Sequence, residues 1–114
     1  MSASDASLAA RVAALLAPLV PAEAAPAGYR RAAVLLPLYP HPTGPHLLLT
    51  KRTRHVPTHK GQVSLPGGGY QERDGDLRVT ALREAEEEIG LRPGDVRLVG
   101  RLDDAVTTAS AFVV

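Results

Sequence analysis

The segment 81–90, with the sequence ALREAEEEIG, constrains the fold of this chain more than any other stretch. In an α-helix, which turns about 100° per residue, three of its four glutamates share one face: Glu84, Glu87 and Glu88. Glu86 points nearly the opposite way. Like charges at i, i+3 and i, i+4 destabilise an isolated helix by about 0.2–0.5 kcal/mol per pair. The segment therefore predicts a helix whose acidic face binds a cation.

The same segment predicts how the helix packs and where it ends. An apolar stripe at i, i+3 and i+7 runs along another arc: Leu82, Ala85 and Ile89. This pattern is typical of an amphipathic helix that packs against a sheet. We expect the helix to begin near Leu77, with Asp74 or Asp76 as its N-cap. Gly90 supplies a C-terminal stop.

The cation on the acidic face is predicted to be a divalent metal ion. Arg83 reaches Glu87 at i+4, but one guanidinium cannot neutralise three carboxylates. Mg²⁺ and Mn²⁺ prefer oxygen ligands, and Mg²⁺ in phosphate chemistry commonly binds one or two protein carboxylates together with substrate phosphates. A solvated acidic face is the alternative, since charge runs usually lie on the surface.

Two segments precede the helix: 65–70, LPGGGY, and 71–76, QERDGD. Successive glycines bring the backbone close to a ligand or simply form a turn. Their spacing from the helix resembles the Nudix box, Gly-x5-Glu-x7-Arg-Glu-U-x-Glu-Glu-x-Gly-U, in which U is apolar. Gly68 stands at the first glycine, and the second half matches throughout from Arg83 onwards. Asp74 replaces the first glutamate, and one additional residue separates it from Arg83.

The Nudix resemblance implies a fold and a reaction. The implied fold is α/β, a Nudix-type α/β/α sandwich with a mixed sheet, formed as one domain over residues 1–114. Residues 1–28 are expected to form an N-terminal helix and linker, and residues 29–114 the core, from which C-terminal strands and a helix are missing. The implied reaction is metal-dependent hydrolysis of a nucleoside diphosphate linked to another group, with Mg²⁺ or Mn²⁺ as cofactor.

The resemblance also implies residue roles. The expected metal ligands are the carboxylates of the shared face and one backbone carbonyl: Glu84, Glu87, Glu88 and Gly67. Arg83 completes the catalytic set, and we expect it to orient a carboxylate rather than to contact the substrate. A bound metal neutralises the phosphates and lowers the pKa of a bound water. The general base stays open between a glutamate of the box and a residue outside it.

Segment 48–68 resembles the signature of the coenzyme A pyrophosphatase branch, Leu-Leu-Thr-x-Arg-Ser/Ala-x3-Arg-x3-Gly-x3-Phe-Pro-Gly-Gly. Eight positions agree: Leu48, Leu49, Thr50, Arg52, Gly61, Pro66, Gly67 and Gly68. Thr53, Pro57 and Leu65 depart from it. The implied products are 3′,5′-ADP and 4′-phosphopantetheine or its acyl form. Two alternatives stay open, a different nucleoside diphosphate derivative such as ADP-ribose or a nucleotide sugar, and a non-catalytic nucleotide-binding module.

The basic segment 51–60 is either a solvated loop or an anion-binding edge. Beside a pyrophosphate site, its cations are expected to bind substrate phosphates, including the 3′-phosphate of coenzyme A. The expected substrate-binding residues lie in or next to this segment: Arg52, His59, Lys60, Gly61 and Gln62. Further along the chain, Asp103 and Asp104 are expected either to form a turn or to support the metal ligands.

Length, charge and cysteine content exclude several classes of protein. A chain of 114 residues forms one domain. Its net charge of +1 argues against a dedicated nucleic-acid-binding or membrane-surface protein. It contains no cysteine, which suits a reducing cytoplasm, and no apolar run approaches the roughly 18 residues of a membrane span. We therefore expect a cytoplasmic protein whose partner is a small nucleotide.

Periodicity predicts the remaining elements. A helix is expected over 7–19, with one apolar face: Leu8, Val12, Leu15, Leu16 and Leu19. Strands are expected over four ranges: 31–38, 46–52, 95–102 and 110–114. The apolar segment 110–114 closes the sequence, so we expect an uncovered apolar sheet face and association into a homodimer.

Overall fold

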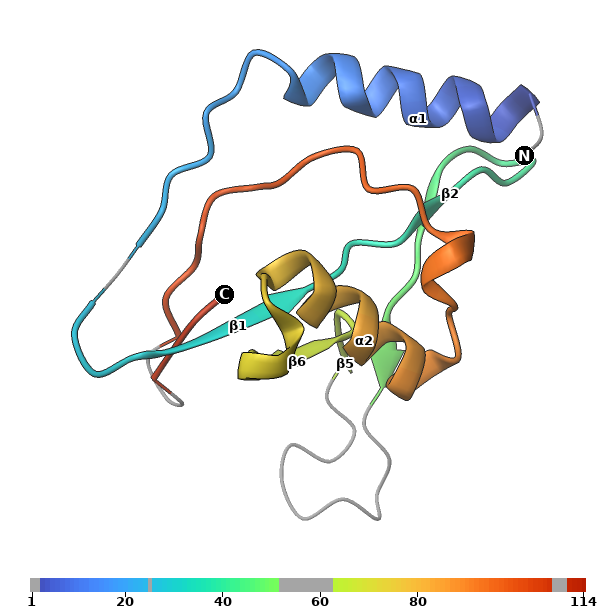
Figure 1. Ribbon diagram of the computed structural model, residues 1–114. Coiled ribbons are helices and arrows are strands. Elements are labelled where there is room, and N and C mark those ends of the chain that lie inside the picture. Colours follow the sequence, from blue (N-terminus) through green and yellow to red (C-terminus); the bar gives the residue numbers. More distant parts are fainter. Residues whose placement is uncertain (1–2, 25, 52–62, 108–110) are drawn as a thin grey trace.

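The computed structural model of this chain describes four ranges (Figure 1): residues 3–24, 26–51, 63–107 and 111–114. Its centre is a mixed three-stranded sheet in the order β6–β1–β7. β1 (Arg30–Val34) is antiparallel to β6 (Gly67–Gly69) and parallel to β7 (Phe112–Val113). α2 (Leu77–Ile89) packs across β1 and β6. The predicted α/β class with a mixed sheet is confirmed.

Two further antiparallel ladders have two strands each: β2 (Leu38–Tyr39) with β3 (His46–Leu47), and β4 (Thr50–Lys51) with β5 (Val63–Ser64). The strand predicted over 31–38 therefore divides before Pro37, which has no N–H to donate to a ladder. The strand predicted over 46–52 also divides. The N–H of Leu48 donates to the Pro37 carbonyl at 3.0 Å, and beyond it the chain leaves β2 and pairs with β5.

The strand predicted over 95–102 is wrong. A 3₁₀ turn, η2 (Pro93–Asp95), leads into irregular backbone, and Val106 makes an isolated bridge to Val113. A strand needs a neighbour that accepts its N–H groups, and in the described ranges no strand runs beside residues 96–102. The strand predicted over 110–114 is confirmed in its described part as β7.

The ends of α2 lie where the sequence predicted them. Asp76 is the N-cap, and its Oδ1 accepts hydrogen bonds from the backbone N–H of Arg78 at 2.8 Å and of Val79 at 3.2 Å. These bonds satisfy N–H groups that lack helical partners. Gly90 ends the helix in the left-handed conformation, with φ of 70°, and its N–H donates to the Glu86 carbonyl.

α2 packs on the sheet through small side chains. Ala81 and Ala85 are buried against Leu35, which follows β1. Leu82 and Ile89 are half-buried, so the predicted apolar stripe is confirmed at its centre, Ala85, and is only partly covered at its two ends. Small residues one turn apart allow the helix backbone to approach the sheet more closely than a leucine would. This close approach brings Glu84 of α2 onto Gly68 of β6.

α1 (Ala3–Leu16) lies apart from the central sheet and α2 (Figure 1). It ends earlier than predicted, because Pro18 lacks an N–H and disfavours helical backbone in the residue before it. The side chain of Leu16, the last residue of α1, packs on Gly100. A Cβ added to Gly100 would lie 2.5 Å from Leu16 Cδ1. Leu15 is largely exposed, so the predicted apolar face is wrong at that residue. α1 packs on the irregular backbone around Gly100 instead of on a sheet.

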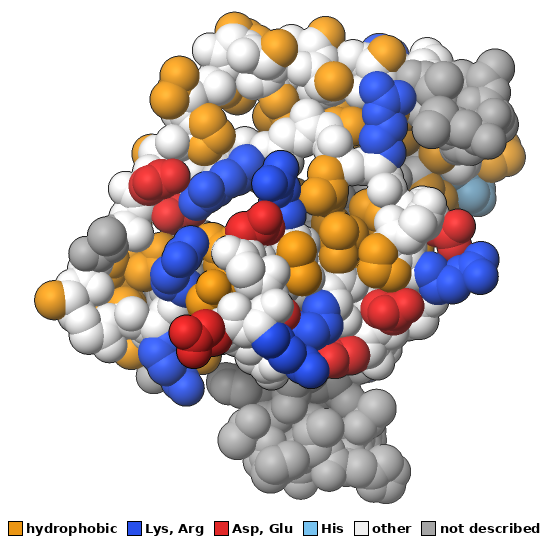
Figure 2. Space-filling model, in the orientation of Figure 1, with side chains coloured by type: hydrophobic (Ala, Val, Ile, Leu, Met, Phe, Trp, Pro, Cys, Tyr) orange, Lys and Arg blue, Asp and Glu red, His pale blue; other side chains and the backbone are white. Residues whose placement is uncertain are grey.

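Few apolar residues of the described chain are buried: Ala32, Leu35, Pro66, Ala81, Ala85 and Val113. Val113 is covered and Phe112 is half-buried, so β7 does not form the open apolar surface that the sequence suggested. Figure 2 shows hydrophobic side chains (orange) across the visible face of the molecule instead. Among the large apolar residues of the described chain, Val20 is highly exposed. Within the four described ranges, no helix has the length and apolar character needed to cross a bilayer.

Candidate active site

Arg83, a residue of α2, lies at the centre of an acidic cluster. Its Nε and Nη2 donate to the two carboxylate oxygens of Asp74, at 2.8 and 3.1 Å, as a bidentate pair. Its Nη1 donates to Glu84 Oε1 at 2.9 Å and lies 3.4 Å from Glu87 Oε2. Nη2 also donates to the Gly69 carbonyl at 3.1 Å. We call these five residues the Arg83 cluster.

Asp74 is the acidic partner of Arg83, despite the additional residue between them in the Nudix-box spacing. Its Oδ2 also accepts hydrogen bonds from Thr80 Oγ1 at 2.8 Å and from the backbone N–H of Gln71 at 2.9 Å. The hydrogen bond from Arg83 is the largest cause that holds the pKa of Asp74 far below its usual value, although burial acts in the opposite direction. The same bond raises the pKa of Arg83. Both groups therefore stay charged.

The 3₁₀ turn η1 (Glu72–Asp74) places Asp74 beside the helix. Gly75 follows with a positive φ of 80°, which glycine adopts readily, and returns the chain to the N-cap of α2. The additional residue of the box is thus accommodated before the helix begins. The spacing within the helix is unchanged, so the relation of Arg83 to the glutamates after it is kept.

The glycines of β6 make room for Glu84. A Cβ on Gly68 would lie 2.5 Å from Cδ of Glu84 and 2.6 Å from its Oε1. A Cβ on Gly67 would collide with the Ala33 carbonyl of the neighbouring strand. The glycine triplet is therefore a strand, not the turn that was one interpretation of it. Its second glycine brings a half-buried carboxylate directly against the sheet.

Two of the predicted metal ligands, Glu84 and Glu87, meet at Arg83 Nη1. Glu88 is exposed, as is Glu86 on the far side of the helix. Across the part of the chain that the structure describes, no three acidic or histidine side chains gather closely enough to hold an ion together. The donor chemistry of Glu84 and Glu87 fits a divalent cation, because carboxylate oxygens are ligands that Mg²⁺ and Mn²⁺ prefer, and Mg²⁺ commonly binds one or two of them.

The predicted substrate-binding residues lie outside the described residues: Arg52, His59, Lys60, Gly61 and Gln62. The Gly67 carbonyl, predicted as a further metal ligand, belongs to β6, where Gly67 is paired with Val34.

Asp103 and Asp104 lie away from the Arg83 cluster and bind the N-terminal linker. Asp103 Oδ1 accepts from the Ala22 N–H at 2.8 Å, and Asp104 Oδ2 from the Ala24 N–H at 3.0 Å. Asp104 Oδ1 accepts from Arg101 Nη2 at 2.6 Å. The bond from Ala24, then that from Arg101, lowers the pKa of Asp104. We call this group the Arg101 clamp, and it replaces both roles considered from the sequence.

Three members of the site were missed by sequence reasoning: Gln71, Gly69 and Thr80. Gln71 and Gly69 act through backbone atoms, which no side-chain pattern reveals. Thr80 had a signal, because a threonine at a buried position of an otherwise apolar helix face needs a polar partner.

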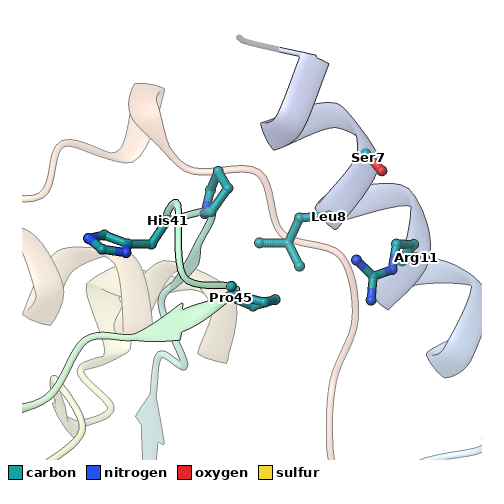
Figure 3. Close-up of a pocket in the computed structure, with 7 residues that line it drawn as sticks. Ser7, Leu8, Arg11, His41 and Pro45 are labelled. Atoms are coloured by element: carbon teal, nitrogen blue, oxygen red, sulfur yellow. The ribbon is translucent and has the colours of Figure 1, made fainter.

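An open hollow of about 400 Å³ lies between α1 and the turn that joins β2 to β3 (Figure 3). Ser7, Leu8 and Arg11 line it from α1, and His41 and Pro45 from the turn. None of these residues belongs to the Arg83 cluster.

Comparison with known proteins identifies the family. A model described as the NUDIX domain matches residues 28–113. A protein of Shigella flexneri serotype 5b (strain 8401), called "Uncharacterized Nudix hydrolase NudL", is 45% identical over 84 residues, which cover 72% of this chain and 43% of that protein. Its namesake in Escherichia coli (strain SMS-3-5 / SECEC) is 46% identical over 81 residues, 69% of this chain and 42% of that protein. The chain thus spans less than half the length of these curated relatives. With its acidic helix held by Arg83, this chain belongs to the Nudix family.

Proposed function

We propose that this chain is a metal-dependent hydrolase that cleaves the pyrophosphate bond of coenzyme A or its derivatives. Nudix hydrolases act on small nucleotide substrates and generally use divalent metal ions such as Mg²⁺ or Mn²⁺. The observation that carries the proposal is the meeting of Glu84 and Glu87 at Arg83 Nη1. It orients two carboxylates of the box on one side of α2. Segment 48–68 supports coenzyme A through its resemblance to the pyrophosphatase signature.

Each residue has a role in this proposal. Glu84, Glu87 and Glu88 hold the metal, together with the Gly67 carbonyl. The metal, when bound, neutralises the phosphates and lowers the pKa of a bound water. Arg83 does not contact the substrate: its donors are directed at Asp74, two glutamates and the Gly69 carbonyl, so it fixes where the Glu84 carboxylate lies.

The substrate is bound by the basic segment. Arg52, His59 and Lys60 bind the phosphates, and Gly61 and Gln62 are further substrate-binding residues in this proposal. Water attacks one phosphorus of the pyrophosphate, the bond to the bridging oxygen breaks, and two phosphate monoesters leave. The base that accepts the proton of this water is a glutamate of the box or a residue outside it.

A different nucleoside diphosphate derivative is the second candidate, because Pro57 stands where the coenzyme A signature has an arginine. ADP-ribose or a nucleotide sugar would use the same acidic helix. The proposed setting is the cytoplasm, which the cysteine-free sequence suits. Association into a homodimer stays a prediction, and light scattering of the purified chain tests it.

Glu87→Gln tests the acidic face. This substitution removes one charge and keeps helix propensity, so hydrolysis in Mg²⁺ or Mn²⁺ should fall by about 100-fold or more with little change in folding. The matched control is Glu86→Gln, on the opposite side of α2, which should keep activity within about threefold. Rates are measured on coenzyme A, dephospho-coenzyme A, ADP-ribose and a nucleotide sugar. Equal losses for both variants contradict the assignment, and turnover of ADP-ribose alone selects the second candidate.

A further inference from the structure

Thr80 has no exposed surface, although it is polar and lies on the inner face of α2. Buried positions on such a face usually carry apolar side chains, because a buried hydroxyl without a partner is unfavourable. The neighbouring buried residues of the helix, Ala81 and Ala85, follow that rule. The hydroxyl of Thr80 must therefore serve a specific contact.

That contact is with Asp74 rather than with the helix backbone. A buried helical threonine often donates to the carbonyl four residues before it. Here Thr80 Oγ1 lies 3.3 Å from the Asp76 carbonyl but 2.8 Å from Asp74 Oδ2. A hydroxyl has one proton to donate, and the shorter contact to a charged acceptor is the stronger one. The proton is therefore directed at the Asp74 carboxylate.

The bond to Thr80 fixes how the Asp74 carboxylate is turned. Its Oδ2 accepts from Thr80, from the Gln71 N–H and from Arg83 Nη2, while its Oδ1 accepts from Arg83 Nε. The guanidinium is planar and rigid, so the plane of the carboxylate sets the plane of the guanidinium. Once these two are aligned, Nη1 of Arg83 points at the carboxylates of Glu84 and Glu87.

We infer that Thr80 is a positioning residue of the acidic helix, whose hydroxyl sets the orientation of Asp74 and, through Arg83, the placement of Glu84 and Glu87 for a divalent cation. This inference rests on the proposed function, because it gives the glutamates the role of metal ligands. Thr80 itself contacts neither metal nor substrate.

Thr80→Val and Thr80→Ser separate the hydroxyl from the shape of the side chain. Valine keeps the branched shape and removes the donor, whereas serine keeps the donor and removes a methyl group. The binding of Mn²⁺ is measured by electron paramagnetic resonance of the free ion, with kcat, KM and Tm for each variant. Removing a supporting hydrogen-bond partner of a metal site commonly costs 10–100-fold, and Thr80 acts through two intervening groups. We therefore expect about a tenfold higher Kd for Mn²⁺ and about a tenfold lower kcat in Thr80→Val.

Further results distinguish positioning from stability. Thr80→Ser should bind Mn²⁺ within about twofold of the unchanged protein although its Tm falls, since a methyl-sized cavity remains. KM should change little in either variant, because neither substitution alters a predicted substrate-binding residue. The matched control is Ala81→Gly, which weakens the same helix without touching the cluster. It should lower Tm and leave the Kd for Mn²⁺ within about twofold.

Each outcome decides the matter. Thr80→Val with unchanged Mn²⁺ affinity overturns the inference and leaves the proposed function standing. Weaker Mn²⁺ binding in Ala81→Gly, to the same extent as in Thr80→Val, also overturns it, because stability would then be the cause. If Thr80→Val does not fold, Thr80→Ser decides: retained affinity at a lower Tm supports the inference, and lost affinity overturns it. An unchanged protein that neither binds Mn²⁺ nor hydrolyses any substrate contradicts the proposed function as well.

Discussion

Arg83 and Arg101 each bind an aspartate, in surroundings that differ sharply in burial. The side chains of Arg83 and Asp74 are 15% and 1% exposed, whereas those of Arg101 and Asp104 are 47% and 10% exposed. Arg83 also donates to two glutamates and a backbone carbonyl. Arg101 adds an ion pair to Glu23 at 3.5 Å. The arginine of the buried pair therefore binds more additional partners than the arginine of the exposed pair.

The difference shows how one type of ion pair performs two tasks. In the Arg83 cluster the donors of one rigid guanidinium are directed at several acceptors, so a change at one contact disturbs the others. That arrangement fixes the geometry of the acidic helix. In the Arg101 clamp the two aspartates bind backbone N–H groups of the linker at Ala22 and Ala24. That arrangement joins two distant segments and leaves α2 untouched.

Among the substitutions that compare the two arginine–aspartate pairs, Arg83→Lys has the largest expected effect. An ammonium group cannot make the bidentate pair with Asp74 and still reach Glu84 and Glu87. The buried Asp74 carboxylate therefore loses hydrogen bonds that offset the cost of burying its charge. We expect hydrolysis to fall by about 100-fold, the upper end for lost supporting contacts, together with a lower Tm. Steady-state kinetics in Mg²⁺ and a thermal melt measure the two. Activity within a few-fold of the unchanged protein would show that the cluster does not set the site geometry.

The sequence was sufficient for the acidic helix because its information is local. Periodicity gave the shared face of the glutamates, and Asp76 and Gly90 cap the helix as predicted. The partner of Arg83 was less certain, since Asp74 reaches it through the 3₁₀ turn η1 and not through helical spacing. A pattern of residue types does not encode that turn. The contacts of Thr80 and of the Gln71 N–H depend on the same turn, and were missed with it.

The Arg101 clamp and the sheet were harder to predict, because they depend on partners far along the chain. Asp103 and the Ala22 N–H are 81 residues apart, and no motif links them. The strand predicted over 95–102 had a suitable run of β-branched and apolar residues but no neighbouring strand in the described chain. Strand propensity reports how well a residue fits a sheet, and the sheet itself is set by non-local pairing.

Asp104→Asn has the next largest effect, on stability rather than on catalysis. The amide replaces one acceptor oxygen by a donor, so either the Ala24 N–H or Arg101 faces a group that cannot accept its hydrogen bond. We expect a loss of about 1–2 kcal/mol in the free energy of unfolding. Urea denaturation at pH 7 measures it. The Kd for Mn²⁺ should not change. A higher Kd would show that the Arg101 clamp also affects the acidic helix.

The pH dependence of that loss identifies its cause. The pKa of Asp104 is lowered in the folded chain, so its charged form stabilises the fold above the pKa of the unfolded chain, about 3.9. This contribution is lost as the pH falls through the folded pKa. The difference between Asp104→Asn and the unchanged protein should therefore be constant from pH 7 to about pH 5 and shrink below about pH 4. A difference that persists unchanged at pH 3 would assign it to packing.

Arg101→Lys should have the smallest effect and gives the sharpest contrast with Arg83→Lys, since the substitution is the same. Arg101 is nearly half exposed, so water competes for its contacts, and an ammonium can still pair with Asp104. Exposed ion pairs contribute about 0–1 kcal/mol, and we expect the free energy of unfolding to change by less than about 0.5 kcal/mol. Asp104 also keeps its bond from the Ala24 N–H, which is the largest cause of its lowered pKa. Hydrolysis should be unchanged. If Arg101→Lys lowered activity as Arg83→Lys does, the linker would be coupled to the acidic helix, and burial would not be what separates the two clusters.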